Sequence, residues 1–300
     1  MALSETREPV ASDGRAALRL DRLSPGDTDA GLALSDAAGW NQTGDDWALF
    51  IRHGHAIGFR EVGANRLVAT AAALPYGASA GWISMVLVTD AWRHRGLAST
   101  LMDACIAHLR GANIVPVLDA TPAGAAVYRR IGFAAGFEID RWECKAPSPG
   151  SSTNEAPALR SAGMADLDAI AALDRASTGL DRRFLLESLL SRPGTRAWLG
   201  ADGGGFVIAR AGRRATQLGP LVARDDGAAI VLLAAAVGAA RASSERSVFL
   251  DLPRGRVAIA AWLEAQGFVR QRPFVRMSLG AAQRPVLGAG SVLLAGPEFG

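Results

Sequence analysis

Residues 81–98, GWISMVLVTDAWRHRGLA, contain the change of pattern that decides the fold. Residues 83–88 are almost entirely β-branched or aliphatic, which is typical of a buried strand. The following residues are polar and basic, and apolar residues recur at helical spacing from Leu97 onward. This pattern predicts a phosphate-binding site, formed by a strand, a loop containing Gly96 and a helix that begins directly after the loop. The first helical N–H groups lack partners, the helix dipole is positive there, and glycine permits close approach.

A second stretch follows downstream. Residues 115–118 form another apolar run, Pro122 is suited to open a helix, and Gly132 is suited to end it. With both stretches in this order, the sequence resembles the GNAT superfamily of acyl-CoA-dependent N-acyltransferases. The two motifs that carry this resemblance are Arg93-x-x-Gly96-x-Ala98 and Tyr128-x-x-x-Gly132-Phe133.

The expected fold class is α/β, more closely an α+β mixed sheet. The elements read from the sequence are strand, two helices, three strands, helix, strand, helix and strands, which is the GNAT order as the resemblance implies it. The second and third strands, residues 55–62 and 66–74, are joined by a hairpin turn. We therefore expect two GNAT-like domains, each a mixed, mostly antiparallel sheet flanked by helices.

An internal repeat and a change of composition divide the chain. Residues 147–157, PSPGSSTNEAP, are predicted to be a linker. We expect residues 1–146 to be the catalytic, acyl-CoA-binding GNAT domain and residues 158–300 to be a second copy of the fold. The tail at residues 291–295 is predicted to be an edge strand.

The second copy departs from the motifs. Its loop, residues 224–228, lacks the Arg-x-x-Gly-x-Ala spacing and carries Asp225 and Asp226, which would repel a pyrophosphate. Leu263 stands where the first copy has Tyr128. We expect this half to have lost coenzyme A binding and to complete the acceptor site or to act as a structural lid, so that one coenzyme A binds per chain.

The resemblance implies acetyl-CoA, or another acyl-CoA, as co-substrate. In the family, backbone N–H groups of the loop bind pyrophosphate and the preceding strand pairs with the pantetheine arm. Thr121 stands where the family has an asparagine, so that contact is left open. The cofactor-binding residues implied in this way are Met85, Val86, Leu87, Val88, Arg93, His94, Arg95, Gly96, Leu97, Ala98, Ser99, Thr121 and Tyr128.

The implied reaction is attack by a neutral amine on the thioester, with Tyr128 protonating or hydrogen-bonding the leaving thiolate. A phenol can donate to a thiolate and be reprotonated from water. The resemblance does not supply the base, because Ser84 stands where many relatives have a glutamate. Asp119, at the end of a strand, is the first candidate and could instead orient the acceptor. His53, His55 and Glu61 are weaker candidates, and a water chain with no single base is an equal alternative.

Polar and aromatic residues gather between the first two predicted helices, where the family forms its acceptor pocket. The alternative is that Trp40 and Trp47 pack the helices on the sheet. In the second half, Asp174, Asp181, Arg182 and Arg183 either bind a charged acceptor or form a solvated helix end. The predicted acceptor residues are Trp40, Asn41, Gln42, Asp46, Ser84 and Asp119.

Composition narrows the function classes. The formal net charge is +3 and the basic residues are scattered, so we expect no nucleic-acid partner. The longest apolar run, residues 228–240, is too short to span a bilayer, and no apolar signal core is present, so a cytoplasmic protein without a membrane partner is expected. Cys105 and Cys144 have no metal-ligand spacing, so no metal is expected.

Two function classes fit these observations. The first is an N-acetyltransferase acting on a small-molecule amine, as a monomer or homodimer. The second is a non-catalytic acyl-CoA sensor or interaction protein. Both bind acyl-CoA, and only the enzyme requires Tyr128.

Overall fold

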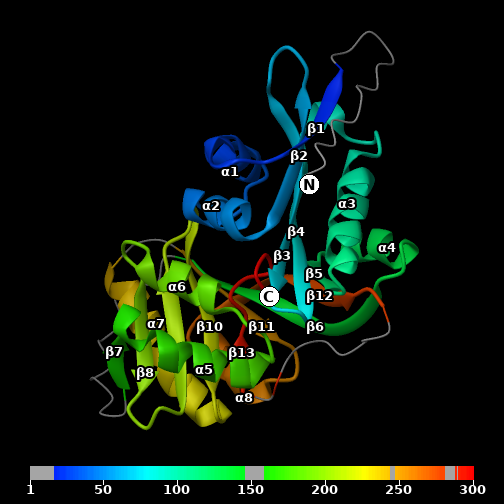
Figure 1. Cartoon of the computed structure of the whole chain (residues 1–300). Helices are drawn as coiled ribbons and strands as arrows, with labels where there is room; N and C mark the ends of the chain where they lie inside the picture. The colour runs from blue at the N-terminus through cyan, green and yellow to red at the C-terminus, as the bar shows by residue number, and fades with distance from the viewer. Residues whose placement is uncertain (1–16, 146–158, 244–246, 281–287, 289) are drawn as a thin grey trace. The chain divides into compact units, whose positions relative to one another are not determined.

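The computed structural model describes residues 17–145, 159–243, 247–280, 288 and 290–300 (Figure 1). The chain divides into two compact units, residues 1–116 and 117–300. The predicted linker, residues 147–157, lies outside the described residues. Each unit is therefore considered by itself.

The first unit has a four-stranded antiparallel sheet in the order β1-β2-β3-β4. Figure 1 shows α1 and α2 on one side of these strands and α3 on the other. The predicted hairpin is present, because β2 and β3 pair directly. The elements are β1 (Leu18–Arg22), η1 (Pro25–Asp27), α1 (Thr28–Ala37), α2 (Gly44–His53), β2 (His55–Glu61), β3 (Leu67–Tyr76), β4 (Ala80–Val88), η2 (Asp90–Trp92) and α3 (Leu97–Gly111).

Small residues let the helices of the first unit pack closely. The indole ring of Trp47 is fully buried and lies against Gly31 of α1, where an added Cβ would come within 2.5 Å of the ring. The indole Nε1–H donates to Ser35 Oγ at 3.0 Å, which satisfies the polar end of the ring. Trp47 therefore fills the packing role that was one of its two predicted roles.

A β-bulge interrupts β4. The register shifts by one residue between the pairs Thr70–Leu87 and Ala72–Ser84, and Met85 has a φ of 55°. The Thr70 hydroxyl donates to the Met85 carbonyl at 2.8 Å and holds the bulge in place. A bulge bends the strand and re-aims the side chains beyond it, so the last residues of β4 are directed differently from the first.

The second unit contains a long mixed sheet in the order β5-β12-β6-β11-β10-β9-β8-β7, with β13 paired to β10. Strand β5 crosses the boundary between the units. The elements are β5 (Val115–Ala120), α4 (Pro122–Arg130), β6 (Ala134–Cys144), β7 (Leu159–Ala162), η3 (Met164–Asp166), α5 (Leu167–Thr178), α6 (Arg183–Ser191), β8 (Arg196–Gly200), β9 (Gly205–Arg210), β10 (Ala215–Ala223), α7 (Asp226–Ser243), β11 (Ser247–Pro253), α8 (Val257–Ala265), β12 (Val269–Ser278) and β13 (Ser291–Leu293).

The last long strands of the two sequence halves are interleaved. Strand β12, from the second half, lies between β5 and β6, and β6, from the first half, lies between β12 and β11. All three pairings are antiparallel. This interleaving ties β5 and β6 to the second half, which explains why the compact units divide at residue 116 and not within residues 147–157.

The tail strand β13 is not an edge strand. The parallel pairing of β10 with β11 ends at Leu218 and Leu250. Beyond that point β13 pairs with β10 through Leu221 and Leu293, and the Leu294 N–H donates to the Asp251 carbonyl of β11 at 3.1 Å. The tail thus lies between the ends of β10 and β11. There it supplies hydrogen-bond partners for backbone N–H and C=O groups that the two strands no longer satisfy in each other.

The interleaving predicts that the first sequence half does not fold alone. A fragment of residues 1–146 would leave β6 without β12 and β11 and would expose the edge of β5. We expect this fragment to aggregate or to lack cooperative unfolding in circular dichroism, and co-expression with residues 158–300 to restore a folded complex in size-exclusion chromatography. A monomeric 1–146 fragment with a cooperative transition would contradict the prediction.

Candidate functional site

The loop between β4 and α3 is open to solvent. It runs from η2 through Arg93, His94 and Arg95 to Gly96, and all four residues are exposed. Gly96 has a φ of 76°, and a Cβ placed there would have no atom within 4 Å. The loop therefore leaves open space directly before the helix.

The N-terminus of α3 offers unpaired donors. In the described part of the chain, the N–H groups of residues 94–99 make no hydrogen bond, and the first helical bond runs from the Thr100 N–H to the Gly96 carbonyl at 3.0 Å. The positive end of the helix dipole lies at the same point. This arrangement fits a phosphate-type anion.

The side chains beside the loop are held in position. Arg93 pairs with Asp90 at 2.8 Å, and the Arg95 guanidinium lies 4.7 Å from the centre of the Trp92 ring. The Trp92 Nε1–H donates to Glu61 at 3.0 Å. These contacts fix the base of the loop while its basic groups face solvent.

Two of the weaker base candidates have structural partners. Glu61 accepts two hydrogen bonds of 2.8 Å from Arg66, which is the main cause of its lowered pKa, in addition to the bond from Trp92. The His55 ring stacks on His108 at 4.2 Å. Burial, with smaller effects of His108 and Arg22, lowers the pKa of His55 to about 4, so its imidazole is neutral at pH 7. His53 is exposed.

The predicted acceptor segment between α1 and α2 is largely buried. Asp46 forms a capping box with Thr43, accepting from the Thr43 N–H at 2.7 Å. Trp40 is half-buried, while Asn41 and Gln42 are buried. The Gln42 Oε1 atom is buried and accepts no hydrogen bond in the described part of the chain. Buried polar atoms are normally hydrogen-bonded, so this amide oxygen lacks the donor that such an atom usually has.

Strand β4 presents a second unpartnered polar atom. Ser84 Oγ, at the start of the bulge, is buried and has no hydrogen-bond partner among the described residues. Met85 and Leu87 are buried, while Val86 and Val88 are half-buried. The predicted cofactor strand is thus present, with a bulge that the sequence did not reveal.

In the second unit, Asp119 is paired with Arg276 of β12. The guanidinium donates to both carboxylate oxygens at 2.8 and 2.7 Å, and the two side chains are 0% and 2% exposed. Both groups are therefore desolvated and satisfied by each other. A carboxylate held in this way is an ion-pair partner and not a free proton acceptor, so the geometry favours a positioning role for Asp119 over the predicted base.

Tyr128 lies on α4, which Thr121 caps by accepting from the Gly124 N–H at 3.3 Å. Its ring is half-buried and lies 6.0 Å from that of Phe133. Burial raises the pKa of the phenol above its ordinary value of 10. The hydroxyl is therefore protonated at neutral pH and can donate a proton.

The corresponding loop in the second sequence half is closed. Asp225 accepts from the Ala228 N–H at 2.8 Å, so a carboxylate of the chain occupies the N-terminus of α7. This bond is the main cause of the lowered pKa of Asp225. Asp226 pairs with Arg256 at 3.0 Å, and Leu263 is fully buried in the apolar core. No open anion site of the α3 type exists here.

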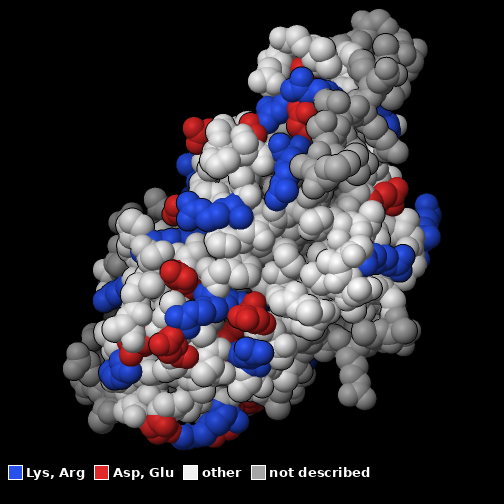
Figure 2. All heavy atoms as spheres, viewed as in Figure 1, with Lys and Arg blue, Asp and Glu red and all other residues white. Residues whose placement is uncertain are grey.

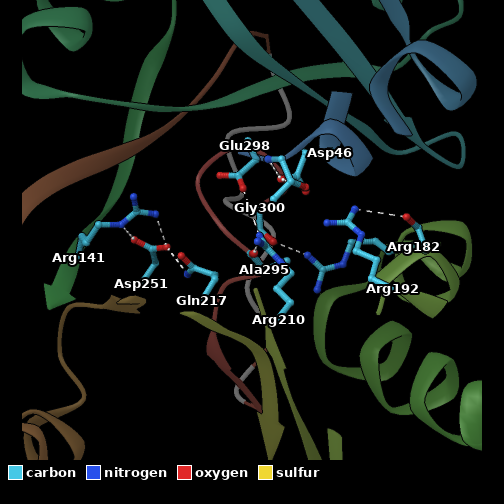
Figure 3. Close-up of polar contacts among 12 residues, drawn as sticks. Asp46, Arg141, Arg182, Arg192, Arg210, Gln217, Asp251, Ala295, Glu298 and Gly300 are labelled. Atoms are coloured by element: carbon cyan, nitrogen blue, oxygen red, sulfur yellow. Dashed lines mark hydrogen bonds and ion pairs between the residues drawn. The ribbon is translucent and has the colours of Figure 1, made fainter. Parts of the chain in front are cut away.

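Other predicted charged residues have structural roles. Asp174 and Arg182 form a buried ion pair of 2.6 Å. Arg182 also donates to the Gly300 carbonyl, and Figure 3 labels both of these residues. Asp174 and Arg182 are therefore neither a solvated helix end nor open to a ligand. Asp168 and Arg183 form an exposed pair of 2.6 Å.

Among the described residues, no helix is long and apolar enough to cross a membrane. No three of the described His, Cys, Asp and Glu side chains gather as metal ligands would. Burial raises the pKa of the Cys105 thiol to about 12, which excludes a reactive thiolate at that position. On the face seen in Figure 2, basic and acidic side chains are interspersed.

Comparisons with known proteins identify a GNAT region in each half of the chain. The model of the acetyltransferase (GNAT) family matches residues 30–133, and the model of an acetyltransferase (GNAT) domain matches residues 170–286. No curated protein sequence matches the chain. Several solved structures share its fold.

Three of these structures show the extent of the likeness. A Pyrococcus horikoshii protein provisionally described as an acetyltransferase is 17% identical, with a TM-score of 0.76 over 99% of this chain and 100% of the other. A tandem GNAT protein from the clavulanic acid biosynthesis pathway is 16% identical, with a TM-score of 0.64 over 89% and 99%. Saccharomyces cerevisiae N-myristoyltransferase is 12% identical, with a TM-score of 0.66 over 93% and 83%.

The pairing of Asp119 with Arg276 predicts a structural cost. Asp119→Asn leaves Arg276 buried without a counter-charge, so we expect the free energy of unfolding to fall by about 3–5 kcal/mol in urea titrations. The matched control is Asp168→Asn in the exposed pair with Arg183, which should cost less than about 1 kcal/mol. An Asp119→Asn variant that lost turnover at unchanged stability would instead support the base assignment.

Proposed function

Because this chain belongs to the GNAT superfamily, with a GNAT domain in each half, we propose that it is an N-acetyltransferase. It transfers the acyl group of acetyl-CoA, or of another acyl-CoA, to a primary amine of a small molecule. The observation that carries this proposal is the exposed loop before α3, where residues 94–99 have unpaired N–H groups beside Arg93 and Arg95. The loop coincides with the motif that first indicated the family.

The residues of the first unit fit acyl-CoA. The N–H groups at the start of α3 can donate to a pyrophosphate, and Gly96 leaves room for its close approach. The backbone of residues 85–88 would hold the pantetheine arm. Gln42 Oε1 and Ser84 Oγ are two of the buried polar atoms of this unit without a partner among the described residues, and we expect an acceptor to satisfy them.

The chemistry assigns one proton donor. The amine nitrogen attacks the thioester carbonyl carbon, a C–N bond forms, and the C–S bond breaks. Tyr128 gives its phenolic proton to the leaving thiolate and recovers one from water. Its raised pKa keeps this proton in place before the reaction.

The amine proton passes to water and not to a dedicated side chain. Asp119 and Glu61 both accept two hydrogen bonds from an arginine, so neither is free to act as the base. The amine must therefore enter as the neutral species. Asp119 holds Arg276 and so orders the sheet face on which both lie.

One acyl-CoA binds per chain. In the second half, Asp225 fills the donor site at the start of α7, and Leu263 takes the place of the tyrosine. Strand β13 also occupies the space between the ends of β10 and β11. Three independent features of the second half thus oppose a second cofactor.

The role of Tyr128 is tested by Tyr128→Phe. We expect turnover, measured as coenzyme A release, to fall more than tenfold, because the thiolate loses its proton donor, while the Kd for acyl-CoA changes less than twofold. The matched control is Tyr76→Phe at the other tyrosine, with turnover within about twofold of wild type. Unchanged turnover in Tyr128→Phe would overturn the assignment, and acyl-CoA binding without turnover on any amine would favour a sensor.

The stoichiometry is tested by calorimetric titration of acetyl-CoA. We expect one site per chain, and no binding by Ala98→Asp, which places a carboxylate in the first turn of α3. The control Ala107→Asp adds the same charge on the exposed side of the helix and should bind normally. Two sites in the wild type would contradict the assignment of the second half.

A further inference from the structure

Polar residues form a row across five neighbouring strands of the second unit. In the strand registers, Arg272 of β12 lies opposite Arg141 of β6, and Arg141 lies opposite Asp251 of β11. Gln217 of β10 donates to Asp251 at 2.9 Å and lies opposite Arg210 of β9. Figure 3 shows four of these residues, from Arg141 to Arg210.

Two of the three arginines in this row pair with a carboxylate of the described residues, and the third does not. Arg141 donates twice to Asp251 at 2.8 Å, and Arg210 pairs with Glu298 at 3.2 Å. Arg272 makes no hydrogen bond and no ion pair with any described residue. The described row therefore carries one uncompensated positive charge.

One N–H donor group of Arg141 also has no partner among the described residues. Its Nε and Nη2 groups bind Asp251, whereas Nη1 has no hydrogen bond among the described residues. The guanidinium groups of Arg272 and Arg141 lie 5.1 and 5.6 Å from the centre of the same Phe274 ring. Both guanidinium groups thus lie near one aromatic ring, and each has N–H groups without a hydrogen-bond partner among the described residues.

The charges of these two groups interact. Arg272 is partly open to solvent. Burial of the rest of the side chain is the main cause that lowers its pKa, and the positive charge of Arg141 is the second cause. Asp251 and Glu298 oppose this effect. An anion bound between the guanidinium groups would relieve their repulsion.

We propose that Arg272 and the Nη1 group of Arg141 bind the carboxylate of the acceptor, so that the substrate is an amine that carries a carboxylate. This inference rests on the proposed function. One uncompensated charge matches a carboxylate better than a phosphate dianion, and the planar guanidinium fork suits it. The Phe274 ring provides an apolar surface for the body of the acceptor.

The position of this subsite on the sheet supports its link to the acceptor. Strand β12 is regular from Arg272 to Arg276, so these two residues and Phe274 lie on one face. Arg276 holds Asp119, which the sequence assigned to the acceptor. A carboxylate at Arg272 would thus lie on the same face of the sheet as Asp119.

The test is calorimetric binding of N-acetyl amino acids and of their amides, which are matched product analogues with and without the carboxylate. It uses the full chain and needs no turnover, so it can fail independently of the enzyme assay. We expect wild type to prefer the acids at least tenfold. Arg272→Gln should remove this preference, and Arg272→Lys should retain part of it.

The matched control is Arg270→Gln on the same strand. Arg270 is exposed and already lies near Glu264 and over the Trp142 ring, so its loss should change the preference less than twofold. Equal binding of acids and amides by wild type, or an equal loss in both variants, would overturn the proposal. Tighter binding of N-acetyl phosphoethanolamine than of every acid would also overturn it, in favour of a phosphate.

Discussion

The antiparallel pairing of β6 with β12 is the interaction on which the second unit depends. Each strand comes from a different sequence half, and each has a further neighbour, β11 or β5. The pairing with β6 places Arg272 opposite Arg141, and the pairing of β12 with β5 places Arg276 opposite Asp119, 157 residues away in the chain. The charged face of this sheet therefore exists only when both halves are folded together.

The local features could be read from the sequence, and the long-range ones could not. The strand before the loop, the hairpin at residues 63–65 and the helix beginning at Leu97 follow from periodicity and glycine placement, and the structure confirms them. The interleaving of β6 and β12 has no local signature, because strand pairing uses backbone groups that every residue carries. For the same reason, nothing near Asp119 indicated that Arg276 would neutralise it.

The two sequence halves show how one architecture gains or loses an anion site through few residues. At α3 the first N–H groups are left without partners and the preceding glycine is open, whereas at α7 Asp225 supplies the missing acceptor from the chain itself. A capping carboxylate stabilises its helix by satisfying these donors. The start of α3 lacks this stabilisation because no side chain caps it. Its N–H donors are therefore available to bind an anionic ligand.

The buried arginines are also satisfied by carboxylates of the chain. Removing a guanidinium from water costs several kcal/mol, and a carboxylate at hydrogen-bond distance offsets this cost. Arg141, Arg182, Arg210 and Arg276 each have such a carboxylate within the chain. These pairs fix the orientation of the side chains around them, so that an incoming anion meets donors that are already ordered. Arg272 differs because its partner is absent from the described chain, and its exposed position lets that partner come from solvent.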